Sequence, residues 1–277
     1  MTLNSTHILN GFLDRDISPL DRGFAYGDGV FRTMKVVNGL PLHWPQHYQK
    51  LVADCAVIGI VCPVAEMLVD DLQHLFTPNE TAVAKITITR GEGERGYAVP
   101  AVTMPTRMVS KSKYPQYAPL NFTDGVQLKV CETTLSAQPK LAGIKHLNRL
   151  ENVMARMEWQ NDAVFDGILL DTNSNAVECT MSNIFARYGI NLVTPTLNQC
   201  GVAGITRQQI LNLASVLNLN VVVDLLPLSK LLNADEVIIC NSLYGAFQVT
   251  KINHDELTKT WQPQALAGAI RVQLKHD

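Results

Sequence analysis

The stretch from residue 111 to residue 124, KSKYPQYAPLNFTD, interrupts the pattern of the chain near its middle. It contains two prolines and three aromatic residues, and it has neither the alternation of a strand nor the spacing of an amphipathic helix. Such a stretch is typical of a connection between domains. We therefore expect an N-terminal domain of residues 1–112, a linker of residues 113–124 and a C-terminal domain of residues 125–277.

The N-terminal part shows both strand and helix patterns. The pair Asn38-Gly39 favours a tight turn between an apolar strand and a returning strand. Strands are expected at residues 31–37, 40–42, 81–89 and 101–109, and helices from residue 45 onward and at residues 64–76. On the first helix, one buried face is expected to hold Tyr48, Leu51, Val52, Cys55 and Ile58.

The C-terminal part mixes the same two patterns. Strands are expected at residues 126–134, 220–225 and 237–240, with several short strands between residues 168 and 194. Helices are expected at residues 148–160, 205–217 and 265–275. No repeat of fixed period is present. We therefore predict a mixed α/β (α+β) chain of two domains.

The composition excludes several classes of function. The chain has 277 residues, of which 47% are hydrophobic, and a net charge of −2 gives no basic excess for nucleic acid or an anionic membrane. The first residues lack the features of a signal peptide, and no apolar run is long enough to cross a bilayer. The six cysteines have no C-x-x-C spacing and the seven histidines do not cluster, so we expect reduced thiols and no metal. A soluble cytoplasmic protein without nucleic-acid or membrane partners is expected.

Lys145 lies in the apolar stretch LAGIKHLNRL at residues 141–150. A lysine held among apolar side chains loses the water that stabilises its ammonium, so its pKa falls towards the range where the free amine exists. A free amine is what condensation with a carbonyl requires. Because most lysines are simply exposed, Lys145 alone is a weak signal.

Glu178 lies in NAVECTMSNIF at residues 175–185, which is typical of a strand, a turn and a second strand. Two interpretations are open. Glu178 can be an outward-facing strand residue, which is the ordinary place for a carboxylate. Alternatively it is buried with a partner, because an unpaired carboxylate among apolar neighbours would be costly.

Two glycine-containing segments are candidate anion sites. GVAGITR at residues 201–207 opens a predicted helix, and the unpaired N–H groups of a helix start can bind an anion, although many helices simply follow a glycine turn. RGEGERGY at residues 90–97 places two arginines beside three glycines, which would suit a substrate rich in carboxylates, but it can equally be a solvated turn.

Taken together, these segments resemble the branched-chain aminotransferase-like, fold type IV family of pyridoxal 5'-phosphate (PLP) enzymes. Four blocks in the family's order carry the resemblance: DRGFAYGDGVF at residues 21–31, the block around Lys145, the block from Glu178 to SNIF at residues 182–185, and GITR at residues 204–207. The resemblance spans nearly the whole chain. It implies two α/β domains with the cofactor in the cleft between them and the cofactor lysine in the C-terminal domain, a homodimer, and a small-molecule substrate with carboxylates.

The resemblance also implies roles for individual residues. Lys145 would be the Schiff-base lysine and proton shuttle, and Glu178 the partner of the pyridine nitrogen. The phosphate would be held by Ile205 and Thr206 at the helix start, by the hydroxyl of Ser242, and by Lys50, which replaces an arginine usual in the family. The substrate would meet Arg95, Tyr97, Tyr26 and Arg32, which stands where D-amino-acid transaminases often have a glutamate.

Within the family, three strings resemble a lyase branch more than the transaminases: LAGIKHLNRLE at residues 141–151, RGxGxRGY at residues 90–97 and ADEVIICN at residues 234–241. That branch converts a chorismate-derived dicarboxylate to 4-aminobenzoate and pyruvate, a step towards folate. A D-amino-acid or branched-chain aminotransferase on the same fold is the main alternative. A PLP-binding protein without catalytic activity is an alternative of another class.

Overall fold

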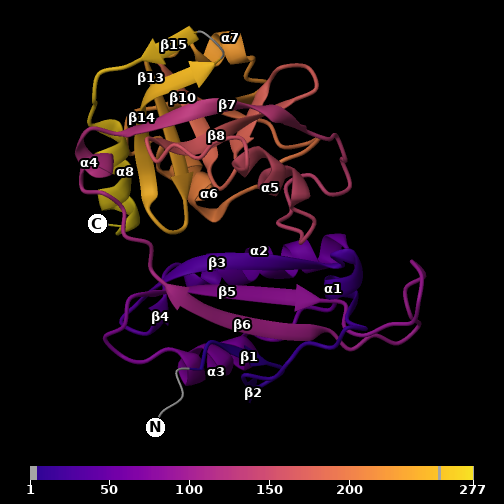
Figure 1. Cartoon of the computed structure of the whole chain (residues 1–277). Helices are drawn as coiled ribbons and strands as arrows, with labels where there is room; N and C mark the ends of the chain where they lie inside the picture. Colours follow the sequence, from indigo (N-terminus) through magenta and orange to yellow (C-terminus); the bar gives the residue numbers. More distant parts are fainter. Residues whose placement is uncertain (1–4, 255–256, 277) are drawn as a thin grey trace. The chain divides into compact units, whose positions relative to one another are not determined.

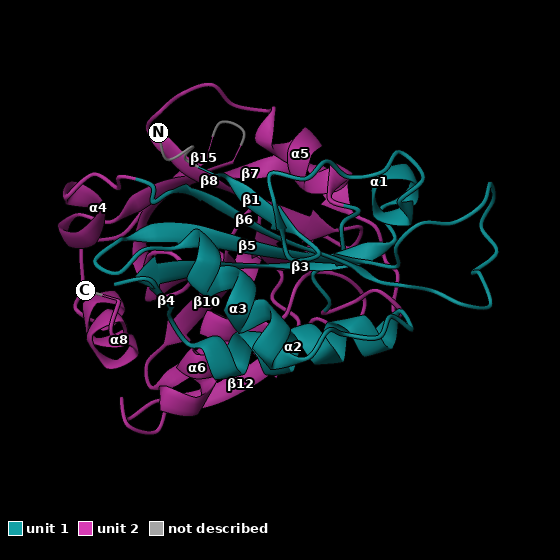
Figure 2. Cartoon of the chain, turned by 90° about the horizontal axis from the view of Figure 1, so that it is seen from below, with its two compact units in different colours: residues 1–115, 144–148 teal, residues 116–143, 149–277 magenta. Residues whose placement is uncertain are grey.

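The computed structural model describes residues 5–254 and 257–276. Two compact units make up the chain, and Figure 2 shows them in different colours. Unit 1 comprises residues 1–115 and 144–148, and unit 2 comprises residues 116–143 and 149–277. Each unit has its own sheet and its own core, so the predicted mixed α/β class is confirmed. The domain boundaries predicted from the sequence stay a prediction, because compactness does not test independent folding.

Unit 1 is built on an antiparallel sheet with the strand order β2-β1-β6-β5-β3-β4 (Figure 1). The strands are β1 (His7–Leu9), β2 (Phe12–Leu13), β3 (Gly29–Val37), β4 (Leu40–Pro41), β5 (Ala82–Thr89) and β6 (Thr106–Lys113). The turn between β3 and β4 has positive φ at both Asn38 (51°) and Gly39 (75°), as a tight hairpin turn of this kind requires. The predicted hairpin is therefore confirmed.

The core of unit 1 lies between this sheet and two helices, α2 (Trp44–Val57) and α3 (Ala65–Leu75), while α1 (Arg22–Tyr26) precedes β3. On β3 every second residue, such as Met34 and Val36, is buried against these helices. The predicted buried face of α2 is partly wrong. Val52 is 39% exposed, whereas Asp54 is fully buried. Periodicity misses a buried aspartate because its place depends on charged partners from elsewhere in the chain.

The last strand of unit 1 begins later than predicted. β6 pairs with β5 from Thr106 to Lys113, so residues 101–105 lie outside the sheet and residues 111–113 lie inside it. Val102 and Met104, whose apolar side chains suggested a strand, are both 84% exposed. Pro105 stands directly before the strand, and a proline has no N–H for a ladder hydrogen bond.

Unit 2 contains a mixed sheet with the strand order β12-β11-β10-β13-β14-β7-β8-β9, and β15 pairs with β14. The strands are β7 (Val126–Leu135), β8 (Val164–Asp171), β9 (Ala176–Cys179), β10 (Asn183–Tyr188), β11 (Asn191–Pro195), β12 (Asn220–Asp224), β13 (Glu236–Asn241), β14 (Gly245–His254) and β15 (Leu257–Thr260). Most of these strands were predicted. The exceptions are β14 and β15, which no pattern in the sequence predicted.

The helices of unit 2 are α4 (Leu120–Thr123), α5 (Leu150–Arg156), α6 (Ile205–Leu213), α7 (Leu228–Leu231) and α8 (Leu266–Leu274). Helices α6 and α8 share a core cluster with β10 and β13, through Ile210, Ile270, Phe185 and Ile238. Helices α5 and α6 are confirmed but shorter than predicted, and α4 lies within the segment predicted as a linker. Within residues 5–254 and 257–276, no helix is long and apolar enough to cross a membrane.

Candidate active site

Lys145 is fixed to unit 1 by backbone pairing with the start of β3. Its carbonyl accepts a hydrogen bond from the N–H of Phe31 at 2.9 Å, and the N–H of Leu147 donates to the carbonyl of Gly29 at 3.0 Å. The Nζ atom of Lys145 lies 4.7 Å from the centroid of the Phe31 ring, which is a cation–π distance. Lys145 is half-buried and follows the buried Ile144. The backbone here therefore places the amine against an aromatic face of the sheet.

Three predicted residues of unit 1 meet at Asp54, which the sequence reasoning did not single out. Its carboxylate accepts hydrogen bonds from the guanidinium of Arg32, from the ammonium of Lys50 and, at 3.2 Å, from the backbone N–H of Lys145. Burial lowers the pKa of Lys50 and the charge of Arg32 lowers it further, whereas Asp54 raises it. Burial also lowers the pKa of Arg32, which Asp54 counteracts.

Glu178 lies in β9, where every residue is buried. Its side chain is 3% exposed, so the outward-facing interpretation is wrong. The Oε2 atom accepts a hydrogen bond from the backbone N–H of Val202 at 2.8 Å. Glu178 is thus a buried carboxylate that holds the glycine-containing loop before α6.

A second side chain fixes the same loop. Asn183 donates from Nδ2 to the carbonyl of Val202 at 2.8 Å and accepts at Oδ1 from the N–H of Gly204 at 3.1 Å. Gly204 caps α6 with extended backbone, and no side chain among the described residues caps the helix start. A Cβ atom at Gly204 would lie 2.3 Å from Oδ1 of Asn183, so a larger residue would force Asn183 to move. The loop is therefore held rigidly, and the helix start keeps its first N–H groups for another acceptor.

Two hydroxyls lie beside this helix start. Oγ1 of Thr206, in the first turn of α6, lies 3.5 Å from Oγ of Ser242, which follows β13. Helix N–H groups together with hydroxyls are the usual donor set for a phosphate. The structure thus brings together the predicted residues Ile205, Thr206 and Ser242 within unit 2.

The loop at residues 90–97 is held by Arg22, which the sequence reasoning did not single out, and by Tyr26, which it named as a substrate residue. The Arg22 guanidinium donates to the carbonyls of Gly96, Tyr97 and Ala98 at 3.0 to 3.3 Å. The Tyr26 hydroxyl accepts from the N–H of Gly96 at 3.0 Å, and the rings of Tyr26 and Tyr97 lie 5.5 Å apart. Arg22 therefore acts as a clamp for the loop backbone.

The two arginines of this loop have different surroundings. Arg90 pairs with both carboxylate oxygens of Asp28, at 2.7 and 3.0 Å, and donates to two backbone carbonyls, so its guanidinium is engaged within unit 1. Arg95 and Tyr97 are exposed. Arg32 is buried and bonded to Asp54, so its role as a substrate ligand stays a prediction.

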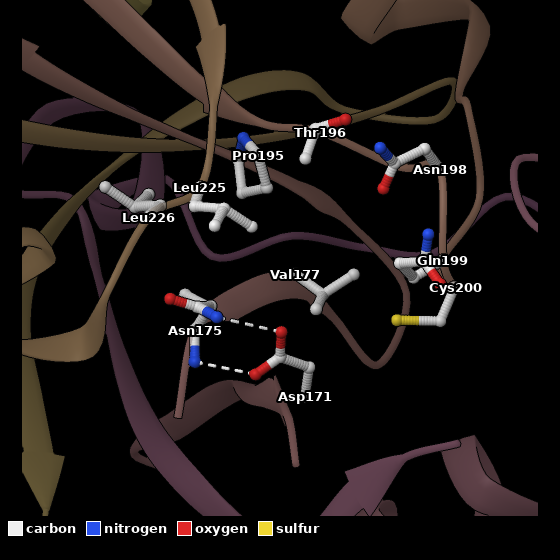
Figure 3. A pocket seen from close by; sticks show the side chains of 11 residues that line it. Asp171, Asn175, Val177, Pro195, Thr196, Asn198, Gln199, Cys200, Leu225 and Leu226 are labelled. Atoms are coloured by element: carbon white, nitrogen blue, oxygen red, sulfur yellow. Dashed lines mark hydrogen bonds between the residues drawn. The ribbon is translucent and has the colours of Figure 1, made fainter. Parts of the chain in front are cut away.

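One pocket of unit 2 includes Val177 and Cys200, which directly precede Glu178 and Gly201 (Figure 3). It is lined by residues that include Asp171, Asn175, Thr196 and Cys200. The Asp171 carboxylate accepts two hydrogen bonds at 2.9 Å from Asn175, and burial raises the pKa of the Cys200 thiol to about 11. Its acidic group is engaged and the raised pKa keeps its thiol protonated at neutral pH, and none of the predicted site residues lines it.

Comparison with known proteins identifies relatives over almost the whole chain. Residues 29–252 match the family model described as amino-transferase class IV. An aminodeoxychorismate lyase of Vibrio harveyi is 36% identical over 90% of this chain and 92% of its own. The crystal structure of 4-amino-4-deoxychorismate lyase from Pseudomonas aeruginosa is 36% identical, covers 98% of both chains and has a TM-score of 0.90. A hypothetical aminotransferase from Mycobacterium tuberculosis in a PLP-bound form, at 18% identity and 98% coverage of both chains, has a TM-score of 0.81 and shows the fold alone.

Proposed function

The chain belongs to the amino-transferase class IV family, and from this premise we propose that it is a lyase that converts 4-amino-4-deoxychorismate to 4-aminobenzoate and pyruvate. The observation that carries the proposal is the 36% identity, over nearly the full length, to two relatives named for that reaction. The cofactor is pyridoxal 5'-phosphate, and the expected fold type IV architecture is confirmed.

The donor set of unit 2 fits this cofactor. A buried carboxylate such as Glu178 suits a protonated pyridine nitrogen, because a buried ion is stabilised by an opposite charge beside it. The uncapped start of α6 at Ile205 and Thr206, with the hydroxyl of Ser242, suits a phosphate. In unit 1, Lys145 would carry the cofactor and Lys50 would bind its phosphate.

The chemistry follows from these assignments. When bound, the cofactor supplies an electron sink for charge that develops on the carbon attached to the amine nitrogen. The free Lys145 amine would take the proton from that ring carbon of the substrate. The electron pair left on the ring would expel the enolpyruvate oxygen and make the ring aromatic, and the enolpyruvate would take up a proton to give pyruvate. Glu178 would keep the pyridine nitrogen protonated throughout.

The substrate carries two carboxylates, and the residues proposed to recognise it are Arg95, Tyr97, Tyr26 and Arg32. Arg95 lies in the loop that Arg22 and Tyr26 hold in place, so its guanidinium is presented from an ordered backbone. A guanidinium pairs with a carboxylate through two parallel hydrogen bonds. A homodimer and a cytoplasmic location remain further parts of the proposal.

The direct experiment is to incubate the PLP-loaded protein with 4-amino-4-deoxychorismate and to measure 4-aminobenzoate and pyruvate. Wild type should release both in equal amounts, and Lys145→Ala should lose at least about a hundredfold in turnover because the base is gone. Lys140→Ala, an exposed lysine before the same block, is the matched control and should remain active. A wild-type protein that binds PLP but releases no 4-aminobenzoate would contradict the proposal.

The aminotransferase alternative differs in one half-reaction. An amino acid alone should convert a transaminase to its pyridoxamine form, whereas the lyase should keep the spectrum of its loaded form. A PLP-binding protein without activity would show the cofactor spectrum and no turnover with either substrate.

A further inference from the structure

The carboxylate of Asp54 has no exposed surface, although it lies in the last turn of α2. A buried carboxylate is tolerated when charged or hydrogen-bonding partners replace the water it has lost. Asp54 has three such partners from three separate places in the chain: Arg32 on β3, Lys50 one turn earlier on α2, and the backbone N–H of Lys145. All of them lie within unit 1.

One carboxylate faces two cations, and the side chains of Arg32 and Lys50 are only 3% and 23% exposed. Within the described residues, the Nε atom of Arg32 is buried and makes no hydrogen bond. Cationic groups with so little access to water are stabilised by nearby anions.

The two carboxylate oxygens of Asp54 contact different partners. Oδ1 receives the Lys50 ammonium, whereas Oδ2 receives Arg32 and the N–H of Lys145. The Asp54 carboxylate therefore fixes the position of the Lys50 ammonium relative to the backbone of Lys145. Arg32 holds that carboxylate from the opposite element, because β3 packs against α2.

We propose that Asp54 is a positioning residue that fixes the Lys50 ammonium for the cofactor phosphate, with Arg32 as the counter-ion that holds Asp54 in place. This inference rests on the proposed function, since it takes Lys50 as a phosphate ligand. A lysine is a flexible point charge, unlike the planar fork of an arginine, so it gains more from a partner that fixes its position. Asp54 touches neither the substrate nor the cofactor in this assignment.

The test measures the binding of PLP and of pyridoxal, which lacks the phosphate, to the protein freed of cofactor. Asp54→Asn keeps the shape of the side chain but removes its charge, so PLP affinity should fall by about tenfold or more while pyridoxal affinity changes little. The matched control is Asp71→Asn on α3. Asp71 is also buried and ion-paired, with Arg107 at 2.7 Å, but it lies outside the site. It should leave both affinities unchanged.

A second readout is the pH at which PLP affinity declines. Asp54 raises the pKa of Lys50 against the lowering by burial and Arg32, so without that charge the ammonium should lose its proton at a lower pH. In Asp54→Asn the decline of PLP affinity should therefore begin at a lower pH than in wild type. A residue that only supported the fold would not move this midpoint.

Removal of Asp54 alone leaves two buried cations, which can prevent folding. The double variant Arg32→Gln and Asp54→Asn removes both members of the most buried pair and should show the same phosphate-specific loss. The inference is overturned if the affinities for PLP and for pyridoxal fall equally, or if the PLP affinity of the Asp54 variants equals that of Asp71→Asn. Either result can occur while the lyase assay of wild type is positive. Failure of the proposed function is seen separately, in the wild-type assay.

Discussion

Glu178 and Asp54 are both buried carboxylates, and their partners give them different roles. Asp54 is surrounded by cationic side chains and a backbone N–H, so its negative charge is compensated by groups of the protein itself. Glu178 accepts a hydrogen bond from the backbone N–H of Val202 through Oε2, which anchors the loop before α6. In the proposed function, Glu178 would also pair with the protonated pyridine nitrogen of the cofactor.

Replacing Glu178 by Gln tests that difference. The amide oxygen can still accept from Val202, so the loop before α6 should stay in place, but a neutral side chain no longer keeps the pyridine nitrogen protonated. We expect PLP to bind and turnover to fall by roughly a hundredfold, as when one preorganised electrostatic contact is removed. The measurements are the rate of 4-aminobenzoate release and the absorbance of bound cofactor. Wild-type turnover in this variant would show that Glu178 serves the loop alone.

At the scale of elements, local signals predicted most of the fold. Asn38-Gly39 fixed the hairpin because both residues tolerate positive φ, and the apolar alternation of residues 126–134 marked β7. The end of β6 could not be predicted, because it is set by pairing with β5 rather than by its own residues. The same limit applies to the site. Asp54 takes partners from residues 32 and 145, and no spacing rule links them.

The start of α6 gives a prediction at this scale. In Gly204→Ala the new Cβ would lie 2.3 Å from Oδ1 of Asn183, which must move or push the helix start away. We expect a loss of about 1 to 3 kcal/mol in the free energy of unfolding and weaker PLP binding, because the first N–H groups of α6 are displaced. Urea unfolding and PLP titration measure the two effects.

Asn183 offers the matching control. In Gly204→Ala combined with Asn183→Ala the clash is gone, so part of the lost stability should return even though two hydrogen bonds of Asn183 are missing. If the double variant loses as much free energy of unfolding as the two single variants together, the contact between residue 204 and Asn183 is contradicted.

At the scale of the whole molecule, each unit has its own core, and each contains buried polar side chains. In unit 2 this group is Asp166, which accepts hydrogen bonds from the hydroxyls of Thr180 at 2.6 Å and Ser182 at 2.7 Å. Ser182 in turn lies 2.6 Å from the hydroxyl of Tyr244. Because two cores need not unfold together, the stability of unit 2 should be followed by its own probe. Trp44 lies in unit 1, so fluorescence of a Trp44→Phe background reports Trp159 and Trp261 of unit 2.

In that background Asp166 should make the stability of unit 2 depend on pH. Burial raises the pKa of Asp166 above 3.8, although the hydrogen bonds from Thr180 and Ser182 oppose the shift. The folded protein therefore keeps this proton at pH values where the unfolded chain has lost it. The resulting stability is fully present below pH 3.8 and is lost as the pH rises through the raised value. Asp166→Asn cannot titrate, so the difference in unfolding free energy, variant minus wild type, should increase with pH across this window and then level off.

Glu158, also in unit 2, provides a control, because its contribution to stability should change with pH in the opposite direction. Burial raises its pKa, but hydrogen bonds from the N–H groups of Thr133 and Glu132, at 2.8 Å each, outweigh burial and bring the pKa below 4.5. Its stabilisation is present above pH 4.5 and is lost as the pH falls through the lowered value. Glu158→Gln should therefore be less stable than wild type at neutral pH, with the gap closing in acid. Urea unfolding at a series of pH values distinguishes the effects of Asp166 and Glu158. If the free energies of unfolding of wild type and Asp166→Asn change in parallel with pH, the role given to the buried aspartate is contradicted.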